Sequence, residues 1–337
     1  MSTPLLQLDR LAKHYPVRGS WLDLLRRATP GALRAVDCVD LTIAAGEIVA
    51  LVGESGSGKT TTGKLITLQE RPSSGSLHFD GVDIAALRGP EVTAYRRRVQ
   101  MIFQNPYEAL DPRYTILDAV MEPLAIHRIG SARDRRSAAR EMLDRVDLRP
   151  ADRFANRYPS DLSGGQLQRA AIARALVLGP SLVVADEPVS MLDVSVRAGV
   201  MNLMLGLSRD LGLASLYITH DLAVARAMSS RIAVMYLGAI VEEGPTETIV
   251  ARAAHPYTRL LVAAVPEHRP GVRRNRIRLQ GEARSLTAPP PGCRFAPRCP
   301  RAEPLCHHTP PPKVGLAFNH WSACHFAEEV GARPALL

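Results

Sequence analysis

A glycine-rich octapeptide is the segment of this sequence whose chemistry is easiest to infer. It follows the apolar run Ile48–Val52, which predicts a buried strand, and it opens a segment of helical spacing. Glycines allow backbone N–H groups to turn toward an anion, and a helix that starts here adds partial positive charge. The pattern G-x-x-x-x-G-K-[ST] therefore predicts a loop that binds nucleotide phosphates, and an ordinary glycine-rich turn is the alternative. The octapeptide reads Gly53-Glu54-Ser55-Gly56-Ser57-Gly58-Lys59-Thr60.

Four side chains are expected to serve the phosphates, a magnesium ion and a water molecule. Lys59 would reach the β- and γ-phosphates, and the Thr60 hydroxyl would ligate Mg²⁺. Asp186 and Glu187 end a second apolar run, Leu182–Ala185, and strand alternation predicts that their side chains point to opposite sides. Asp186 would hold Mg²⁺ through its water shell, and Glu187 would orient or deprotonate the attacking water. A solvated strand end is the alternative for these two carboxylates.

A second anion-binding turn is predicted at Leu162-Ser163-Gly164-Gly165-Gln166. It precedes a segment of helical spacing, Leu167–Leu178, so its backbone N–H groups and the Ser163 hydroxyl would face an anion. One chain rarely needs two such turns for one nucleotide. The simplest use of the second turn is to close over a nucleotide that another copy or a paralogue holds.

The elements that must position these residues alternate between short apolar strands and helices up to about Pro266, which is typical of an α/β domain. Ile116–Arg128 and Ser137–Val146 have helical spacing with no strand between them, which indicates a helical subdomain over about residues 105–178. We expect a first domain at residues 1–266 and a small C-terminal domain at 267–337. The predicted strands are Ile48–Val52, Leu77–Phe79, Gln100–Phe103, Leu182–Ala185, Ser215–Thr219 and Ile232–Tyr236.

Three segments lie outside this alternation. Val17–Arg34 is predicted to be an extra loop or a short helix. Arg273–Arg301 is rich in arginine, and such a run is either solvated or in contact with lipid headgroups or a partner subunit. Pro289–Gly292 is a stiff spacer between the two expected domains.

Composition and charge exclude several classes of protein. The chain has 337 residues, 46% of them hydrophobic and 22% charged, which excludes a collagen-like or wholly disordered chain. Its net charge of +9 suits a nucleic acid, an anionic membrane surface or a phosphate ligand equally well. No apolar run reaches the roughly 18 residues of a spanning helix, and the N-terminus lacks the apolar core of a signal peptide. These features predict a soluble intracellular protein.

Five motifs together resemble the nucleotide-binding subunits of ATP-binding cassette (ABC) transporters over most of the chain. The family's phosphate loop matches the octapeptide, and its LSGGQ signature matches Leu162–Gln166. Its glutamine loop, D-loop and switch histidine match Gln104, Ser190–Asp193 and His220. The resemblance implies a P-loop NTPase fold with a RecA-like parallel-sheet core, an N-terminal antiparallel β part and a helical subdomain. It also implies an ATPase that uses ATP and Mg²⁺.

The resemblance implies roles for single residues as well. Tyr15 would stack on adenine, with an exposed strand tyrosine as the alternative. Gln104 would contact Mg²⁺ and report to the transmembrane partner, and His220 would grip the γ-phosphate and position Glu187. Thr61 joins the octapeptide in the expected nucleotide site. The residues expected to act on the nucleotide of a partner subunit are Ser163, Gly164, Gly165 and Gln166, together with Asp193 of the D-loop.

Three segments resemble the ATPases of oligopeptide, dipeptide and nickel importers, and Tyr107 favours the second ATPase of the pair. They are Phe103–Arg113, His255–Leu261 and Pro290–Phe295. The resemblance implies peptide import by a heterodimer of two ATPases, two transmembrane permeases and an extracytoplasmic peptide-binding protein. This chain would lie on the cytoplasmic side of the cell membrane as a peripheral subunit. Nickel or another small solute is an alternative substrate, and a soluble non-transport ABC ATPase is a further alternative, but no nucleic-acid partner is expected.

Four of the five cysteines lie in the expected C-terminal domain. Their spacing lacks the C-x-x-C pair of common zinc sites, and a disulfide is not expected in the cytosol. Related importer ATPases carry an iron–sulfur cluster in this tail, and four thiolates suit [4Fe–4S], with zinc and free thiols as alternatives. Such a metal would hold together a domain too small to be stable alone. The fifth cysteine, Cys38, is expected in the core. The candidate ligands are Cys293, Cys299, Cys306 and Cys324.

Overall fold

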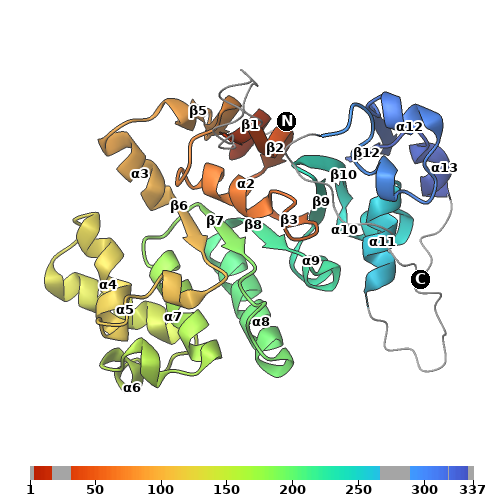
Figure 1. The fold of residues 1–337 in the computed structure, drawn as a ribbon. Coiled ribbons are helices and arrows are strands. Elements are labelled where there is room, and N and C mark those ends of the chain that lie inside the picture. The colour runs from red at the N-terminus through yellow and green to blue at the C-terminus, as the bar shows by residue number, and fades with distance from the viewer. Residues whose placement is uncertain (1–3, 17–31, 266–288, 318, 333–337) are drawn as a thin grey trace, which may run out of the picture.

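The computed structural model describes residues 4–16, 32–265, 289–317 and 319–332, and its fold is built on two β-sheets (Figure 1). The larger sheet has eight strands in the order β11-β12-β10-β9-β3-β8-β7-β6. Its pairs from β9 through β6 are parallel, and the pairs β9/β10, β10/β12 and β12/β11 are antiparallel. These strands are β3 Ile48–Val52, β6 Val99–Ile102, β7 Leu182–Asp186, β8 Ala214–Thr219, β9 Arg231–Tyr236, β10 Ala239–Pro245, β11 Lys313–Ala317 and β12 His320–Ala323.

The central strands are mostly apolar because both faces of the sheet are covered. On β3, Ala50 and Val52 belong to the core cluster shared with helices α4–α9, whereas Val49 and Leu51 belong to the cluster shared with the smaller sheet. This alternation explains why the strand segments read as mostly apolar runs. The predicted α/β class and the six predicted strands are confirmed, with ends that differ by up to three residues.

The smaller sheet is antiparallel and N-terminal, as expected, with the strand order β2-β1-β4-β5. Strand β2 begins at Ala32, so the prediction of a loop or short helix was wrong for residues 32–34, and residues 17–31 lie outside the described part. The expectation that Cys38 is a core residue was also wrong, because Cys38 is exposed and takes a positive φ of 56° at an irregular point of β2. These strands are β1 Leu6–Pro16, β2 Ala32–Ile43, β4 Ser74–Phe79 and β5 Val82–Asp83.

Helices α4, α5, α6 and α7 lie between β6 and β7 in sequence and gather at one end of the molecule (Figure 1). Helix α5 begins with a capping box of Ser131 and Asp134, which satisfies backbone donors at its N-terminus. Among the described residues, no helix combines the length and the apolar character needed to cross a bilayer. Up to residue 252, the α-helices in the described part of the chain are α2 Lys59–Ile66, α3 Pro90–Arg98, α4 Ile116–Ile126, α5 Ala132–Arg145, α6 Asp152–Ala155, α7 Gly164–Leu176, α8 Val194–Leu211, α9 Leu222–Met228 and α10 Thr246–Arg252.

The C-terminal segment, residues 289–317 and 319–332, packs against the edge of the larger sheet and against α11 Pro256–Ala264 (Figure 1). It contains α12 Pro304–His308 and α13 Ala327–Ala332, and its strand β12 pairs with β10. Residues 266–288, which include most of the arginine-rich run, lie outside the described part. The sheet therefore continues through the expected domain boundary at residue 266.

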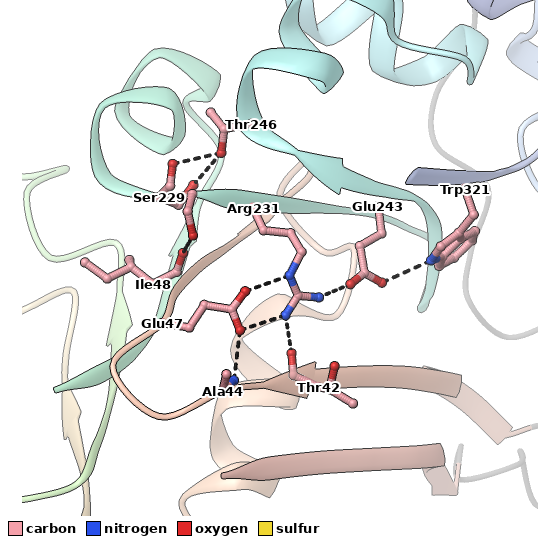
Figure 2. A network of polar contacts seen from close by, with 10 residues as sticks. Thr42, Ala44, Glu47, Ile48, Ser229, Arg231, Glu243, Thr246 and Trp321 are labelled. Atoms are coloured by element: carbon pink, nitrogen blue, oxygen red, sulfur yellow. Dashed lines mark hydrogen bonds and ion pairs between the residues drawn. The ribbon is translucent and has the colours of Figure 1, made fainter. Parts of the chain in front are cut away.

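A partly buried polar network joins this segment to both sheets (Figure 2). The Arg231 guanidinium of β9 donates to both carboxylate oxygens of Glu47, at 2.8 and 3.0 Å. It also contacts Glu243 of β10, whose other oxygen accepts from the Trp321 indole of β12 at 3.2 Å. Burial raises the pKa of Glu243, and its contacts with Arg231 oppose that rise. Such a network is stable only while its members stay paired, so it fixes β12 against the ATPase-like core.

Candidate functional site

The phosphate loop has the strand–loop–helix context that its sequence predicts. It leaves β3, curls through residues 53–58 and enters α2 at Lys59. Two glycines are required by space: a Cβ on Gly53 would lie 2.2 Å from the Met235 carbonyl oxygen, and one on Gly58 would lie 2.1 Å from the Ala35 carbonyl oxygen. Gly58 also has a φ of +106°, which side chains rarely adopt. The loop therefore lies directly on the neighbouring backbone and leaves its open side for a ligand.

A cavity of about 680 Å³ opens over this loop. Eleven of the residues that line it were predicted from the sequence, and three more, Leu33, Ala35 and Leu261, were not. Gly53, Ser57 and Asp186 lie beneath the cavity wall and are buried. The predicted lining residues are Tyr15, Glu54, Ser55, Gly56, Gly58, Lys59, Thr60, Thr61, Gln104, Glu187 and His220.

Glu187 is held from two sides at the mouth of this cavity. Its Oε1 lies 2.8 Å from the His220 Nδ1, and its Oε2 accepts from the Gln104 amide at 3.2 Å. The Gln104 amide also donates to the Ser190 hydroxyl at 3.3 Å. Three segments predicted separately, the glutamine loop, the strand-end carboxylate and the switch histidine, therefore meet at one carboxylate. A carboxylate so oriented is suited to accept a proton from a water molecule.

Strand alternation does not set the direction of Glu187, which corrects the prediction. Strand β7 ends at Asp186, and Glu187 follows with a φ of +45° in the left-handed region. Its N–H donates to the Ile218 carbonyl at 2.9 Å, which holds the turn. A non-glycine residue in this conformation carries strain of order 1–3 kcal/mol, and such strain collects at functional sites.

Burial shifts the pKa values of Asp186 and Lys59 in opposite directions. Burial raises the pKa of Asp186, although a hydrogen bond from Thr60 and the charge of Lys59 oppose the rise. Burial lowers the pKa of Lys59, although the carboxylates of Glu187, Asp186 and Glu54 oppose the fall. The Lys59 ammonium donates to the carbonyls of Gly53 and Glu54 at 2.8 and 2.9 Å. A divalent cation beside Asp186 and phosphates beside Lys59 would each favour the charged form.

Tyr15 lies at the outer wall of the cavity, and its hydroxyl donates to the Glu70 carboxylate. Burial and the Glu70 contact raise the pKa of Tyr15 to about 12, so the ring stays neutral. The Lys13 ammonium lies 5.1 Å from the centre of the ring. Tyr15 thus adds an aromatic side chain to the lining of the cavity, where a planar ligand could contact it.

The signature turn does not line this cavity. Ser163 caps α7, accepts from the Gln166 N–H at 3.4 Å, and is exposed together with Gly164. Helix α7 begins at Gly164, three residues before its predicted start, so the turn lies directly at a helix N-terminus. Asp193 precedes α8 and is exposed. These residues are available to a ligand outside their own chain's cavity.

Arg298 of the C-terminal segment, together with Tyr257 and Leu261 of α11, lies at the site without having been assigned to it from the sequence. Arg298 pairs with Glu54 across 244 sequence positions, and the Tyr257 hydroxyl accepts from the Glu54 N–H at 2.9 Å. Leu261 falls within a segment matched to importer ATPases, and this was its only sequence signal. Arg298 lies in the arginine-rich run 273–301, but no local pattern identified Glu54 as its partner.

The four C-terminal cysteines surround one small apolar cavity with Phe295 and Phe326. Burial raises the pKa of Cys293, and it raises the pKa of Cys299 and Cys324 to about 11. In the described part of the chain, no group of three or more histidine, cysteine or acidic side chains is arranged to hold a metal ion. The thiols are thus gathered in one place but are not set as ligands.

Comparison with known proteins assigns the chain to a family. Residues 36–190 match the ABC transporter family, and residues 241–306 match the C-terminal region of oligopeptide and dipeptide transporters. A probable peptide ABC transporter ATP-binding protein of Sinorhizobium fredii is 45% identical over 96% of this chain and 90% of its own length. This chain belongs to the ATP-binding proteins of ABC transporters.

Further relatives and a solved structure resemble this ABC ATPase. A dipeptide transport ATP-binding protein of Haemophilus influenzae is 44% identical over 92% of this chain and 93% of its own. An oligopeptide transport ATP-binding protein of Bacillus subtilis is 42% identical over 95% and 97% of the two chains. A dimeric ATP-binding cassette bound to ADP and Pi covers 72% of this chain and 98% of its own, with 33% identity and a TM-score of 0.63.

The family and the geometry agree on the reaction. The ABC ATPase binds ATP with Mg²⁺ and hydrolyses it. Asp186, Thr60 and Gln104 offer the oxygen ligands that Mg²⁺ prefers.

Proposed function

We propose that this ABC ATPase powers the import of peptides across the cytoplasmic membrane. The observation that carries the proposal is the similarity of the whole chain, C-terminal segment included, to ATP-binding proteins of dipeptide and oligopeptide transport. A subunit of this kind works on the cytoplasmic side, bound peripherally to membrane-embedded permeases.

The proposed assembly contains a second, different ATPase, two permeases and an extracytoplasmic peptide-binding protein. The exposed signature turn supports the pairing of two ATPases, because Ser163 and Gly164 lie outside their own cavity at a helix N-terminus. In a head-to-tail pair, each nucleotide would lie between the phosphate loop of one subunit and the signature turn of the other. Asp193, also exposed, would contact the partner beside that turn.

The proposed chemistry assigns one task to each side chain of the cavity. Lys59 and the N–H groups of residues 53–60 bind the phosphates, and the Tyr15 ring contacts the adenine. Glu187 accepts the proton of the attacking water, and His220 fixes that carboxylate at 2.8 Å. Bound Mg²⁺ supplies positive charge that offsets the phosphate charge, and Asp186, Thr60 and Gln104 are the residues that would hold it.

Two bound nucleotides would stabilise the closed state of the ATPase pair. Shifting a two-state assembly from 1:99 to 99:1 takes about 5.5 kcal/mol of differential binding, or about 2.7 kcal/mol for each nucleotide. Several charge-assisted hydrogen bonds to phosphate supply that amount. Hydrolysis removes this stabilisation, so the ATPase pair opens and the permeases return to their starting state.

Affinity purification of the tagged Glu187→Gln chain from its own cells, with Mg-ATP and mild detergent, tests the proposed assembly. We expect mass spectrometry to find two permeases, a second ATPase and a peptide-binding protein. A nickel-binding protein in place of the peptide-binding one would move the substrate to nickel. A homodimer that brings nucleic acid or ribosomes would contradict transport altogether.

We also propose a [4Fe–4S] cluster on the four C-terminal cysteines, which line one cavity and whose thiolates would have to move closer together to hold it. Protein purified without oxygen is expected to contain about four iron atoms per chain, and Cys299→Ser is expected to lose most of them. Cys38→Ser is the matched control, because Cys38 is exposed on the other sheet. Zinc in place of iron would favour the alternative metal, and neither metal would mean free thiols.

A further inference from the structure

The loop from Cys293 to Cys299 lies against the phosphate-loop side of the ATPase core. Phe295 is 1% exposed, and its ring packs on Tyr236 and Tyr257 with centroids 5.3 and 5.4 Å apart. Arg294 donates to the Asp37 carboxylate at 2.6 Å and to the Leu237 carbonyl. The loop is thus anchored at Arg294 and Phe295, which precede Arg298 in the chain.

Arg298 forms a two-pronged ion pair with Glu54 of the phosphate loop. Its Nη1 and Nη2 donate to the two carboxylate oxygens at 2.8 and 3.2 Å. The Arg298 side chain is only 9% exposed, and its Nη1 also donates to the Tyr236 hydroxyl at 3.3 Å. The Glu54 contact raises the pKa of Arg298, so the guanidinium stays charged. Paired geometry of this kind is specific to arginine and orients the carboxylate as well as neutralising it.

Glu54 is an unexpected neighbour for ATP, because it lines the cavity and carries the same sign of charge as the phosphates. Its charge also acts on Lys59, the cation expected to bind those phosphates. An unpaired Glu54 would therefore repel the nucleotide and compete for its main cation. The ion pair with Arg298 neutralises the charge of Glu54. It also holds the Glu54 carboxylate on the side of the phosphate loop that faces the C-terminal segment.

We propose that Arg298 is a positioning residue for ATP binding, and that the C-terminal segment thereby forms part of the nucleotide site of its own chain. Arg298 acts through Glu54 and does not touch the nucleotide. The inference rests on the proposed role of the phosphate loop in binding ATP, and it is independent of the transported solute.

The test measures the Kd for Mg-ATP by calorimetry on the purified full chain. Arg298→Gln is expected to weaken ATP binding about tenfold, because it frees a carboxylate a few ångströms from the phosphates. In the assembled transporter the KM for ATP should rise similarly while kcat stays within about twofold. Arg298→Lys keeps the charge but not the paired geometry, so its Kd should lie between those of the wild-type chain and of Arg298→Gln.

A second pair of variants separates positioning from simple support of the fold. Glu54→Gln removes the carboxylate that Arg298 neutralises in the native chain, and it should not weaken ATP binding. In that background Arg298→Gln should change the Kd by less than twofold, since no carboxylate is left to hold. This comparison also decides the matter if the single Arg298→Gln chain does not fold. Arg301→Gln is the matched control, because Arg301 pairs with exposed Glu329 at 3.2 Å in the same segment.

Three results would overturn the inference. The first is wild-type affinity in Arg298→Gln, and the second is an equal loss with and without Glu54, which would make Arg298 a structural support only. The third is a loss in Arg301→Gln as large as that in Arg298→Gln. Failure of the wild-type chain to bind Mg-ATP would instead refute the proposed role of the phosphate loop, and the inference with it.

Discussion

Replacement of Glu187 by glutamine is expected to stop ATP turnover and to leave Mg-ATP binding intact. The amide keeps the size of the side chain and one oxygen for the Gln104 amide, which donates at 3.2 Å in the native chain. It cannot accept a proton from water, and a positioned general base contributes about 10²–10⁴ in rate. We expect kcat to fall at least about 100-fold in the assembled transporter, with the Kd for Mg-ATP changed less than about threefold. Phosphate release and calorimetry measure the two quantities.

The control for Glu187→Gln is the same substitution at a glutamate outside the cavity, Glu247. Glu247 of α10 is exposed and pairs with Arg226 at 2.8 Å, far from the cavity lining. Glu247→Gln should therefore turn over ATP at the native rate. Normal turnover by Glu187→Gln within the transporter would refute the proposed base, and loss of ATP binding would show that Glu187 is needed to build the site.

The parts of the site that the sequence predicted correctly are those that depend on neighbours in the chain. A strand, a glycine loop and a helix follow one another within residues 48–66, so the local pattern contains the whole motif. The same holds for the signature turn, where Ser163 and Gln166 cap the helix that they begin. The central strands could also be predicted from the sequence, because burial on both faces of the sheet makes these segments mostly apolar.

The parts that the sequence did not predict depend on tertiary contacts or on single backbone angles. Glu187 takes its direction from a turn with a φ of +45°, held by the Ile218 carbonyl of the neighbouring strand. Cys38 is exposed because β2 is irregular where it occurs, although Val36 and Val39 close to it in sequence are buried. Arg298 reaches Glu54 only because the C-terminal strands extend the main sheet and bring residues 293–299 beside the phosphate loop.

Replacement of Lys59 by alanine is expected to impair ATP binding and turnover together. The Lys59 ammonium is buried, and three surrounding carboxylates act on its pKa, so its charge cannot be replaced by solvent. Hydrogen bonds to charged groups contribute about 1.5–3 kcal/mol each, so losing this cation should weaken Mg-ATP binding about 100-fold. The kcat should fall as well, because negative charge on the transferred phosphoryl group then lacks a partner in the transition state. Calorimetry and phosphate release on the same preparations measure both losses.

Lys64→Ala is the matched control, because Lys64 lies in the last turn of the same helix and does not line the cavity. It should bind and hydrolyse ATP as the native chain does. Lys59→Ala also leaves the carbonyls of Gly53 and Glu54 without their donor, so circular dichroism must first show a folded chain. A folded Lys59→Ala chain with native affinity for ATP would contradict the assignment of the cavity. The contrast with Glu187→Gln carries the argument, since one substitution should abolish the reaction alone and the other should weaken the complex in which it occurs.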